Sequence, residues 1–249
     1  MEKRIPPHAV AQSDSSSSRS FGLGLIARAG LACAVLWGSA VVAEPATSFR
    51  SIVLRSADDV RIGYAEHPEV TVPPERRDAV TVTVANDQLL IAPRKSNDRT
   101  SRQSRVPILI GVPALNRLEI AGSGEVDITL PHATSLDLVV SGSGNLVTRN
   151  LKVAVLALES EGSGNARIGG VVADRVTLRS AGAGDTLLAG QTNMLKVDAT
   201  GAGDVDTAAL QAAAVTVRND GAGTVRIAPA ATMRIEGSGS GRTLVSERR

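Results

Sequence analysis

Apolar and polar residues alternate in short stretches along most of the chain after residue 48, a pattern typical of β-strands that bury one face. The alternation is clearest before a series of Gly-small-Gly triplets, where an apolar side chain stands four residues ahead of the first glycine. These residues are Leu118, Leu138, Leu158, Leu178, Val197, Val217 and Met233. A second stretch follows the triplets and contains Val126, Leu146, Ala166, Thr186, Val205 and Val225. The pattern predicts two strands per repeat, joined at the glycines.

The triplets recur at an almost fixed interval. They begin at Gly122, Gly142, Gly162, Gly182, Gly201, Gly221 and Gly237, in steps of 20, 20, 20, 19, 20 and 16 residues. A period near 20 indicates stacked units that bury their apolar faces against their neighbours. A tight corner between strands requires a positive φ or a close approach of two backbones, and both conditions favour glycine. We therefore interpret each triplet as a corner that the chain turns once per coil, before a second strand and a short third side of variable length.

This repeat favours a parallel β-helix over a leucine-rich repeat, which has a similar period. A leucine-rich repeat requires an Asn or Cys after its strand and a helix on its outer side, whereas a second strand follows the corner here. Only the Ala-rich stretch at 207–215 has any helical character. Three residues before successive triplets stand Glu159, Arg179, Asp198 and Arg218. In a parallel stack these charges would lie about 4.8 Å apart, with alternating sign, as an exposed ladder.

Residues 49–94 alternate in the same way without a Gly-small-Gly triplet. The stretch SIVLRSADDVRI resembles a degraded repeat, with Ser56-Ala57-Asp58 in place of the glycine corner. The stretch DAVTVTVANDQLLIAP predicts two strands joined by a turn at Asn86-Asp87, before a polar loop and another strand. Terminal repeats are usually atypical because they cap the stack, which accounts for this departure from the pattern.

The first 43 residues have the composition of an export signal. Basic residues precede an uncharged run at 29–43, AGLACAVLWGSAVVA, which ends in small residues of the kind that a signal peptidase recognises. This run is too short to span a bilayer comfortably, since a spanning helix takes about 20 residues. The alternatives to a cleaved signal peptide are an uncleaved anchor that starts near Phe21 and a lipid-modified Cys33.

Cleavage changes the charge and the chemistry expected of the remaining chain. It removes Cys33, the only cysteine, so neither a disulfide nor thiol chemistry is expected. The leader holds four of the 27 basic and two of the 25 acidic residues, which leaves 23 of each sign. A balance near zero offers no electrostatic basis for binding nucleic acid.

The order of these stretches resembles the family called "putative auto-transporter adhesin, head GIN domain". The resemblance is carried by FRSIVLRSADDVRI, VTVTVANDQLLIAP and VPILIGVPALNRLEIAGSGEVDI, followed by the later triplets. It covers roughly residues 49–245, which is most of the chain after the leader. Membership implies an exported, right-handed β-helical domain in a bacterial cell envelope, and it implies no particular activity.

Candidate chemistry is limited to stacked carboxylates. The position after each triplet carries Glu125, Asn145, Asn165, Asp185, Asp204 and Thr224. Asp185 and Asp204 fall on neighbouring coils, where two carboxylates can share a proton, hold a cation or cleave a glycoside. We favour the other interpretation, a polar ladder in which Asn and Asp side chains satisfy backbone groups of the corner. Calcium is disfavoured because Gly- and Asp-rich calcium-binding repeats have a period of about nine residues.

The remaining polar residues do not form a recognisable site in the sequence. His67 and His132 stand beside prolines and are interpreted as turn residues. The loop at 94–105 has five basic residues and one acidic residue, and we interpret it as solvated, with contact to anionic lipid or polysaccharide as the alternative. The sequence thus assigns no catalytic, cofactor-binding or metal-binding residue, and it predicts no cofactor.

We therefore expect a signal peptide at 1–43, a linker at 44–48, one all-β, right-handed parallel β-helix at 49–245 and a tail at 246–249. The predicted function is that of an exported, non-enzymatic protein of the periplasm or cell surface. Its β-helix would serve as a structural or adhesin-like surface for an envelope protein or polysaccharide.

Two other functions compete with this one. The first is a β-helical polysaccharide lyase or hydrolase that uses Asp185 and Asp204. The second is self-association through the open ends of the β-helix, because an open strand edge can pair with another chain. Membrane contact is expected only through an uncleaved leader, and nucleic acid is not an expected partner.

Overall fold

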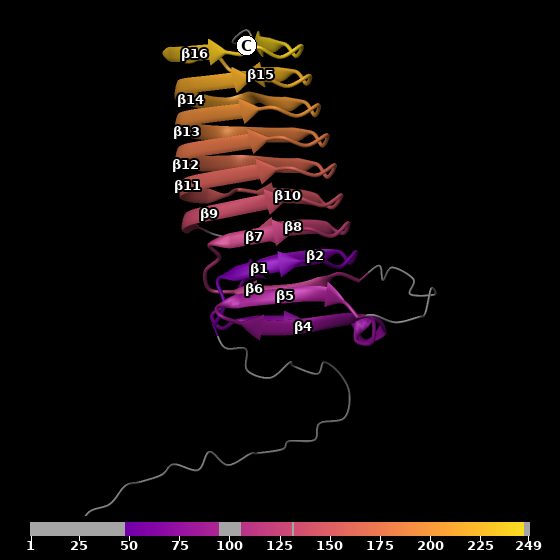
Figure 1. Cartoon of the computed structure of the whole chain (residues 1–249). Helices are drawn as coiled ribbons and strands as arrows, with labels where there is room; N and C mark the ends of the chain where they lie inside the picture. The colour runs from indigo at the N-terminus through magenta and orange to yellow at the C-terminus, as the bar shows by residue number, and fades with distance from the viewer. Residues whose placement is uncertain (1–47, 95–105, 131, 247–249) are drawn as a thin grey trace, which may run out of the picture. The chain divides into compact units, whose positions relative to one another are not determined.

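The computed structural model describes residues 48–94, 106–130 and 132–246, all of which lie in the compact unit Ser39–Arg249. Apart from one 3-10 turn, the regular structure in these ranges is entirely β-strand. The strands form a β-solenoid with about 20 residues per turn, so the predicted fold class is confirmed (Figure 1). No helix in the described ranges is long and apolar enough to cross a membrane. The predicted signal peptide at 1–43 lies outside these ranges.

The strands of the N-terminal part differ in arrangement from those of the repeats. This part contains β1 (Ser51–Leu54), β2 (Val60–Tyr64), β3 (Glu69–Thr71), the 3-10 turn η1 (Pro74–Arg76), β4 (Val80–Ala85), β5 (Gln88–Pro93) and β6 (Ile108–Val112). The repeats contain β7 (Arg117–Ile120), β8 (Glu125–Thr129), β9 (Ala133–Val140), β10 (Asn145–Arg149), β11 (Lys152–Ser160), β12 (Ala166–Ser180), β13 (Thr186–Ala199), β14 (Val205–Asn219), β15 (Val225–Ile227), β16 (Thr232–Glu236) and β17 (Thr243–Val245).

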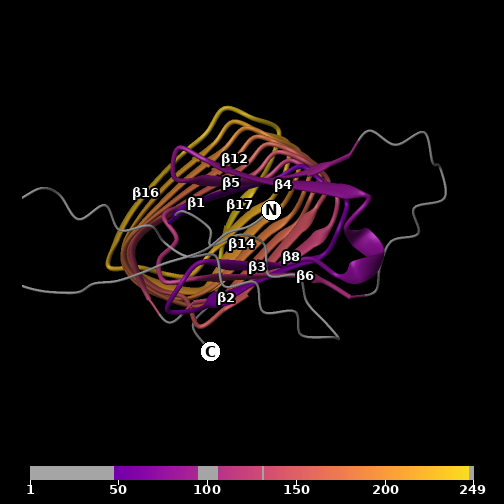
Figure 2. The same cartoon turned by 90° about the horizontal axis from the view of Figure 1, so that it is seen from below.

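Successive coils pair in parallel, as the repeat predicts. Strands β7, β9, β11 and β12 pair in turn, which aligns Leu118, Leu138, Leu158 and Leu178 in one row. Strands β8, β10 and the first part of β12 form the second face, after the corner. The coils superimpose when the stack is viewed along its length (Figure 2). Backbone hydrogen bonding therefore joins residues about one period apart along the chain.

The third side of the coil is more regular than the sequence predicts. In the central coils it is continuous with the strands on both sides, so β12, β13 and β14 are 15, 14 and 15 residues long. The register between these strands shifts between Ile168 and Val171 and again between Leu187 and Ala189. Such irregularities bend a strand without ending its pairing. The Ala-rich stretch at 207–215 is part of β14, not of a helix.

At the N-terminal end, the spatial order of the strands differs from their order in the chain. Strands β1 and β2 lie next to β7 and β8. Strands β5 and β6 come later in the chain but form the next layer outward, parallel to β1 and β2. Strands β4 and β3 pair with them in antiparallel fashion and cover this end (Figure 2). The predicted β4–β5 hairpin is confirmed, with φ values of 51° at Asn86 and 62° at Asp87.

The degraded repeat in the N-terminal part occupies the predicted place. A Cβ atom on Gly122 would collide with the carbonyl oxygen of Ser56, and one on Gly124 with that of Asp58. Ser56-Ala57-Asp58 is therefore the corner beneath the first glycine triplet. Asp58 also forms a buried ion pair with Arg76 of η1, which ties this corner to the covering layer.

Close approach of successive backbones explains the glycines of the corners. A Cβ atom on Gly162 would overlap the carbonyl oxygen of Gly142, and the same relation recurs at the other triplets. Among the described glycines, only Gly170 and Gly190 have a positive φ, and both lie outside the triplets. The sequence left two reasons for glycine open, a positive φ and a close approach of two backbones. The structure supports the close approach. The close contact allows Ser163 N–H to donate to Gly142 O at 3.1 Å.

The final coil turns at a different triplet from the one predicted. The triplet that begins at Gly239, not the one at Gly237, stacks on the triplet that begins at Gly221. In agreement, Met233 pairs with Val215, so an alignment based on Gly237 is wrong by two residues. The stretch GSGSG contains two overlapping triplets, and the pairing of β16 with β14 decides which of them forms the corner.

Rows of aliphatic side chains fill the interior. The row that precedes the corners is buried through Val217, and the row that follows them is buried from Val126 to Val225. A third row, which stands two residues before the corners, contains Ser160 and Ser180 among its aliphatic side chains. The hydroxyls of these two serines are buried and have no hydrogen-bond partner. Phe49 and Leu115 are buried near the N-terminal end of the same core. Each coil therefore depends on its two neighbours for burial.

We expect replacement of Leu158 by Ala to lower the free energy of unfolding by about 2–5 kcal/mol. Leu158 is buried in the middle of its row, and the paired strands on either side cannot close the cavity without breaking their register. Urea unfolding followed by circular dichroism measures the change. Leu187→Ala, on an exposed side chain of β13, is the control and should change the value by about 0.5 kcal/mol or less. Equal effects of the two substitutions would contradict the assignment of the core.

We expect Gly162→Ala to lower the free energy of unfolding by about 1–3 kcal/mol, because the added methyl group overlaps backbone of the neighbouring coil. The neighbouring exposed residue provides a control, since Ser163→Ala adds no atom at the contact and should be nearly neutral. Thermal unfolding of the two variants tests the difference. A G162A protein as stable as the S163A protein would show that the coils are not in close contact at this corner.

Candidate functional site

A row of polar side chains follows the glycine corners along the solenoid. The Oδ1 atoms of Asn145, Asn165, Asp185 and Asp204 each accept a backbone N–H from the same position one coil further on, at 3.0, 2.8, 3.0 and 2.8 Å. Asp59 does the same for Glu125 at the N-terminal end, at 2.9 Å. We call this row the corner ladder. It satisfies one backbone donor per coil at the place where the strands are interrupted.

Asp185 and Asp204 belong to the corner ladder and occupy neighbouring coils, as the sequence predicts. Asp185 accepts the backbone N–H of Asp204, and Asp204 accepts that of Thr224. The other carboxylate oxygen of Asp204 lies 3.4 Å from Nη1 of Arg226. The role seen in the structure is the one that we favoured, in which Asn and Asp side chains satisfy backbone groups of the corner.

The predicted charge ladder is in register. Glu159 pairs with Arg179, Arg179 with Asp198, and Asp198 with Arg218, on four successive coils. This row runs along an exposed or half-exposed face of the solenoid. Pairs of this kind contribute a few tenths of a kcal/mol each, so the row marks the alignment of the coils more than it stabilises them.

Close to the end of the charge ladder, Arg218 forms a tighter pair on its own coil. Its Nε donates to Oδ2 of Asp220 at 2.6 Å, and this hydrogen bond and the carboxylate charge raise the pKa of Arg218. The hydroxyl and the backbone N–H of Ser238 both donate to Oδ1 of Asp220 and, together with Arg218, lower the pKa of that carboxyl. The three residues link the last two coils at their corner.

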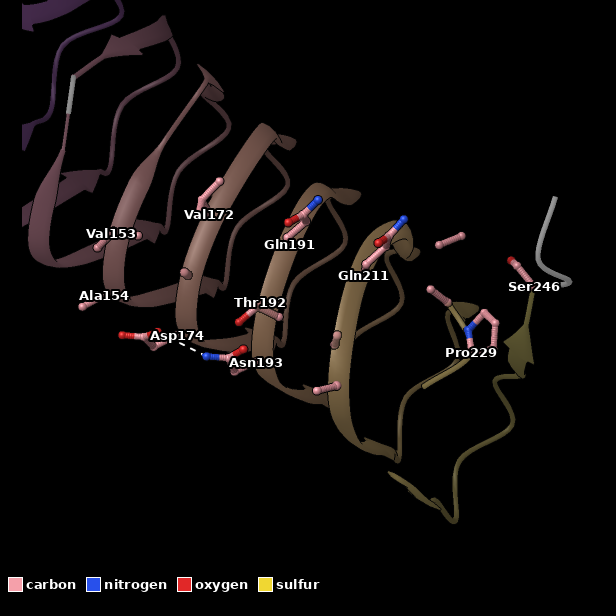
Figure 3. Close-up of a pocket in the computed structure, with 15 residues that line it drawn as sticks. Val153, Ala154, Val172, Asp174, Gln191, Thr192, Asn193, Gln211, Pro229 and Ser246 are labelled. Atoms are coloured by element: carbon pink, nitrogen blue, oxygen red, sulfur yellow. Dashed lines mark hydrogen bonds between the residues drawn. The ribbon is translucent and has the colours of Figure 1, made fainter. Parts of the chain in front are cut away.

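A groove lies on the third side of the coils and extends across several of them. Its cavity volume is about 1250 Å³, and it is lined by β11 to β14 and by the segments that follow β15 and β17 (Figure 3). Pro229 and Ser246 lie at its C-terminal end (Figure 3). The groove is several times larger than a second hollow of about 270 Å³ that lies beside Leu158. It is therefore the best candidate for a binding site.

The groove is built from residues that repeat in register from coil to coil. One wall carries Val172, Gln191 and Gln211, which are paired neighbours on β12, β13 and β14. The adjacent row consists of the small residues Ala173, Thr192 and Ala212, which are also paired. On the other side stand Asp174, Asn193 and Ala213, and Nδ2 of Asn193 donates to Oδ1 of Asp174 at 3.2 Å (Figure 3). The groove thus offers amide groups and small side chains, with one carboxylate.

The groove was not predicted from the sequence. The available signal was the interval of 20 residues between Gln191 and Gln211, with alanine at 173, 208, 212 and 213. That signal becomes visible only when the third sides are aligned, and the register shifts described above obscure the alignment. The predicted candidate residues instead lie at the corner, where the repeat is easiest to recognise in the sequence.

The other residues noted in the sequence do not join the groove. His67 and His132 are exposed, outside the strands, and neither lines it. Of the basic loop at 94–105, only Arg94 lies in the described ranges, where it is exposed. Over the described residues, no group of three or more His, Cys, Asp or Glu side chains is placed to hold a metal ion.

We expect Asp185→Ala to lower the free energy of unfolding by about 1 kcal/mol, because it leaves the backbone N–H of Asp204 without its acceptor. Asp185→Asn is the matched variant. It keeps an Oδ1 acceptor, as Asn165 does one coil earlier, and should retain most of the stability. Chemical unfolding of both variants measures the difference. An asparagine variant as unstable as the alanine variant would show that the charge matters and not the hydrogen bond.

The comparisons with known proteins agree with this architecture. A putative adhesin from Bacteroides fragilis NCTC 9343 has a TM-score of 0.71 at 20% identity, over 84% of this chain and 97% of its own. A putative lipid binding protein from Parabacteroides distasonis ATCC 8503 has a TM-score of 0.66 at 19% identity, over 84% and 98%. At these identities the similarity shows the fold alone.

A third solved structure is also similar, and a comparison of sequences identifies the family. A putative adhesin from Parabacteroides merdae ATCC 43184 has a TM-score of 0.57 at 14% identity, over 83% of this chain and 95% of its own. No curated protein matches the sequence. The sequence profile of the family described as "Putative auto-transporter adhesin, head GIN domain" matches residues 48–248. The chain therefore belongs to this family.

Proposed function

We propose that this protein is an exported, non-enzymatic binding protein of the bacterial periplasm or cell surface, and that the groove holds its ligand. The observation that carries the proposal is the groove itself, whose in-register rows continue over three strands. Membership of a family described as adhesins and the adhesin and lipid-binding names of the structural relatives support a binding role. The basic and apolar leader at 1–43 supports export.

The chemistry of the groove favours an uncharged polysaccharide as the ligand. Gln191 and Gln211 are exposed on adjacent strands, about 4.8 Å apart, and each side chain has both hydrogen-bond donors and an acceptor. Repeated amides suit a ligand that repeats hydroxyl groups along its length. The only charged residue that lines the groove is Asp174, whose Oδ1 accepts a hydrogen bond from Asn193, and no basic residue lines it, so the groove offers no partner for an anionic ligand. The alanines leave room for a chain to lie along the coils.

The position of the carboxylates supports a non-enzymatic role. Asp185 and Asp204 do not line the groove, and their Oδ1 atoms accept backbone N–H groups of the corner. A glycoside-cleaving pair requires two carboxyl groups that flank the bound bond, one of them free to donate a proton. The competing proposal of a lyase or hydrolase would therefore place its catalytic residues away from the groove.

We expect Q191A/Q211A and Ala213→Trp to reduce binding to purified, uncharged envelope polysaccharide by about tenfold or more, because the first removes two amides and the second fills the groove. Ala183→Trp, on an exposed corner position outside the groove, is the matched control and should bind as the unchanged protein does. Isothermal calorimetry gives the affinities, and thermal unfolding checks that each variant folds.

Two results would overturn the proposal. Binding that survives both groove changes would place the ligand elsewhere on the solenoid. Breakdown of the polysaccharide that is lost in D185N and D204N would establish the enzyme instead. Fractionation of cells that express the full chain tests export, which would be contradicted by recovery of the protein in the cytoplasm alone.

A further inference from the structure

The two ends of the solenoid are covered to very different extents. At the N-terminal end, β3 and β4 cover the last parallel layer, and Val70 and Val80 are buried there. At the C-terminal end, β16 continues the rows of the core, but Ile235 is 44% exposed and Val245 of β17 is 46% exposed. In the described part of the chain, β16 pairs only with β14, so its other edge carries no strand. An open edge above an open core is a template for pairing.

The backbone groups at this edge belong to the inward-facing residues. In a parallel pair, the N–H and C=O of one residue point to the same side, and the side alternates along the strand. The backbone groups of outward-facing residues form hydrogen bonds with the preceding coil. For example, the N–H of Asp137 donates to the carbonyl oxygen of Asn116 at 2.8 Å. Arg234 is the equivalent of Asp137 in the last coil, by the register of β14 with β16. The N–H and C=O of Ile235 therefore point to the open edge.

The outward charges of β16 are complementary to themselves. Arg234 and Glu236 flank Ile235, and their side chains are 73% and 55% exposed. They form an ion pair within the strand, with Nε of Arg234 donating to Oε1 of Glu236 at 2.7 Å. When two such strands run antiparallel about a two-fold axis through Ile235, each Arg234 lies opposite Glu236 of the other strand. Opposite charges in directly opposed positions stabilise a strand pair.

We propose that the C-terminal edge of the solenoid is a homodimer interface, in which β16 pairs antiparallel with β16 of a second copy, centred on Ile235. The pair of Ile235 residues exchanges both backbone hydrogen bonds and covers the exposed end of the core. The arrangement is a closed two-fold contact, in which one surface serves both copies. Head-to-tail stacking is disfavoured, because the N-terminal end presents the antiparallel strands β3 and β4 instead of a parallel coil.

Reversal of the charge at Arg234 tests the pairing. The protein is expressed as the full chain, with its own N-terminal region. Arg234→Glu places four carboxylates along the paired edges, and we expect it to weaken the dimer by about tenfold or more in sedimentation velocity. The reciprocal change R234E/E236R restores opposite charges across the axis and should restore the dimer. Arg179→Glu, on the same outward face in the middle of the stack, is the control and should leave the dimer unchanged.

Disulfide trapping tests the geometry of the same pairing. In a Cys33→Ser background, Ile235→Cys places two thiols on directly opposed residues about 5.5 Å apart between Cα atoms, within the range for a disulfide. Oxidation should convert this variant to a covalent dimer. Met233→Cys lies two residues from the axis, opposite Gly237 of the second copy, and should remain uncrosslinked.

Three outcomes would overturn the proposal. The first is a protein that stays monomeric at all concentrations. The second is a dimer that R234E does not weaken and that Ile235→Cys does not crosslink on oxidation. The third is open-ended polymers in place of dimers, which would indicate head-to-tail stacking. The edge shares no residue with the polysaccharide groove, so the dimer can fail while the binding proposal holds, and the reverse.

Discussion

The structure depends on the hydrogen bonds between parallel backbones on successive coils. These bonds hold neighbouring strands about 4.8 Å apart, and that spacing must be kept at the corners as well as along the flat faces. At the triplets, a Cβ atom on the first or third residue would strike a carbonyl group of the coil below. Glycine is thus required by the spacing between coils, although the turn itself uses ordinary φ values. The corner ladder has the same origin, because each side chain reaches a backbone N–H one coil away.

The stacking also explains why this fold suits binding. A residue type that recurs at the same position of the coil becomes a row of identical groups at a fixed spacing. Gln191 and Gln211 form such a row in the groove, and the aliphatic rows of the core follow from the same rule. Such rows match a ligand that repeats its own chemical groups along its length. Chemical specificity depends on which side chains stand in the rows, so the fold alone does not define the ligand.

The two ends show how the solenoid deals with its unpaired edges. At the N-terminal end, the chain folds back so that β3 and β4 cover the layer of β5 and β6, and the ion pair of Asp58 with Arg76 fixes this cover. At the other end the final coil leaves Ile235 and Val245 exposed. A sheet with one covered and one open end forms a closed pair with a second copy more readily than an endless stack. The asymmetry of the ends is the basis of the dimer that we propose.

The sequence by itself determined the period, the strands, the corners and the parallel stack, because all of these follow from local alternation and from glycine at a fixed interval. It also determined the hairpin at Asn86-Asp87 and the register of the charge ladder from Glu159 to Arg218. Only the tertiary structure decided which triplet closes the last coil, since two overlapping triplets satisfy the local pattern equally well. It alone placed β5 and β6 outside β1 and β2, and it alone revealed the groove. These features depend on which distant strands pair, and a local pattern does not carry that information.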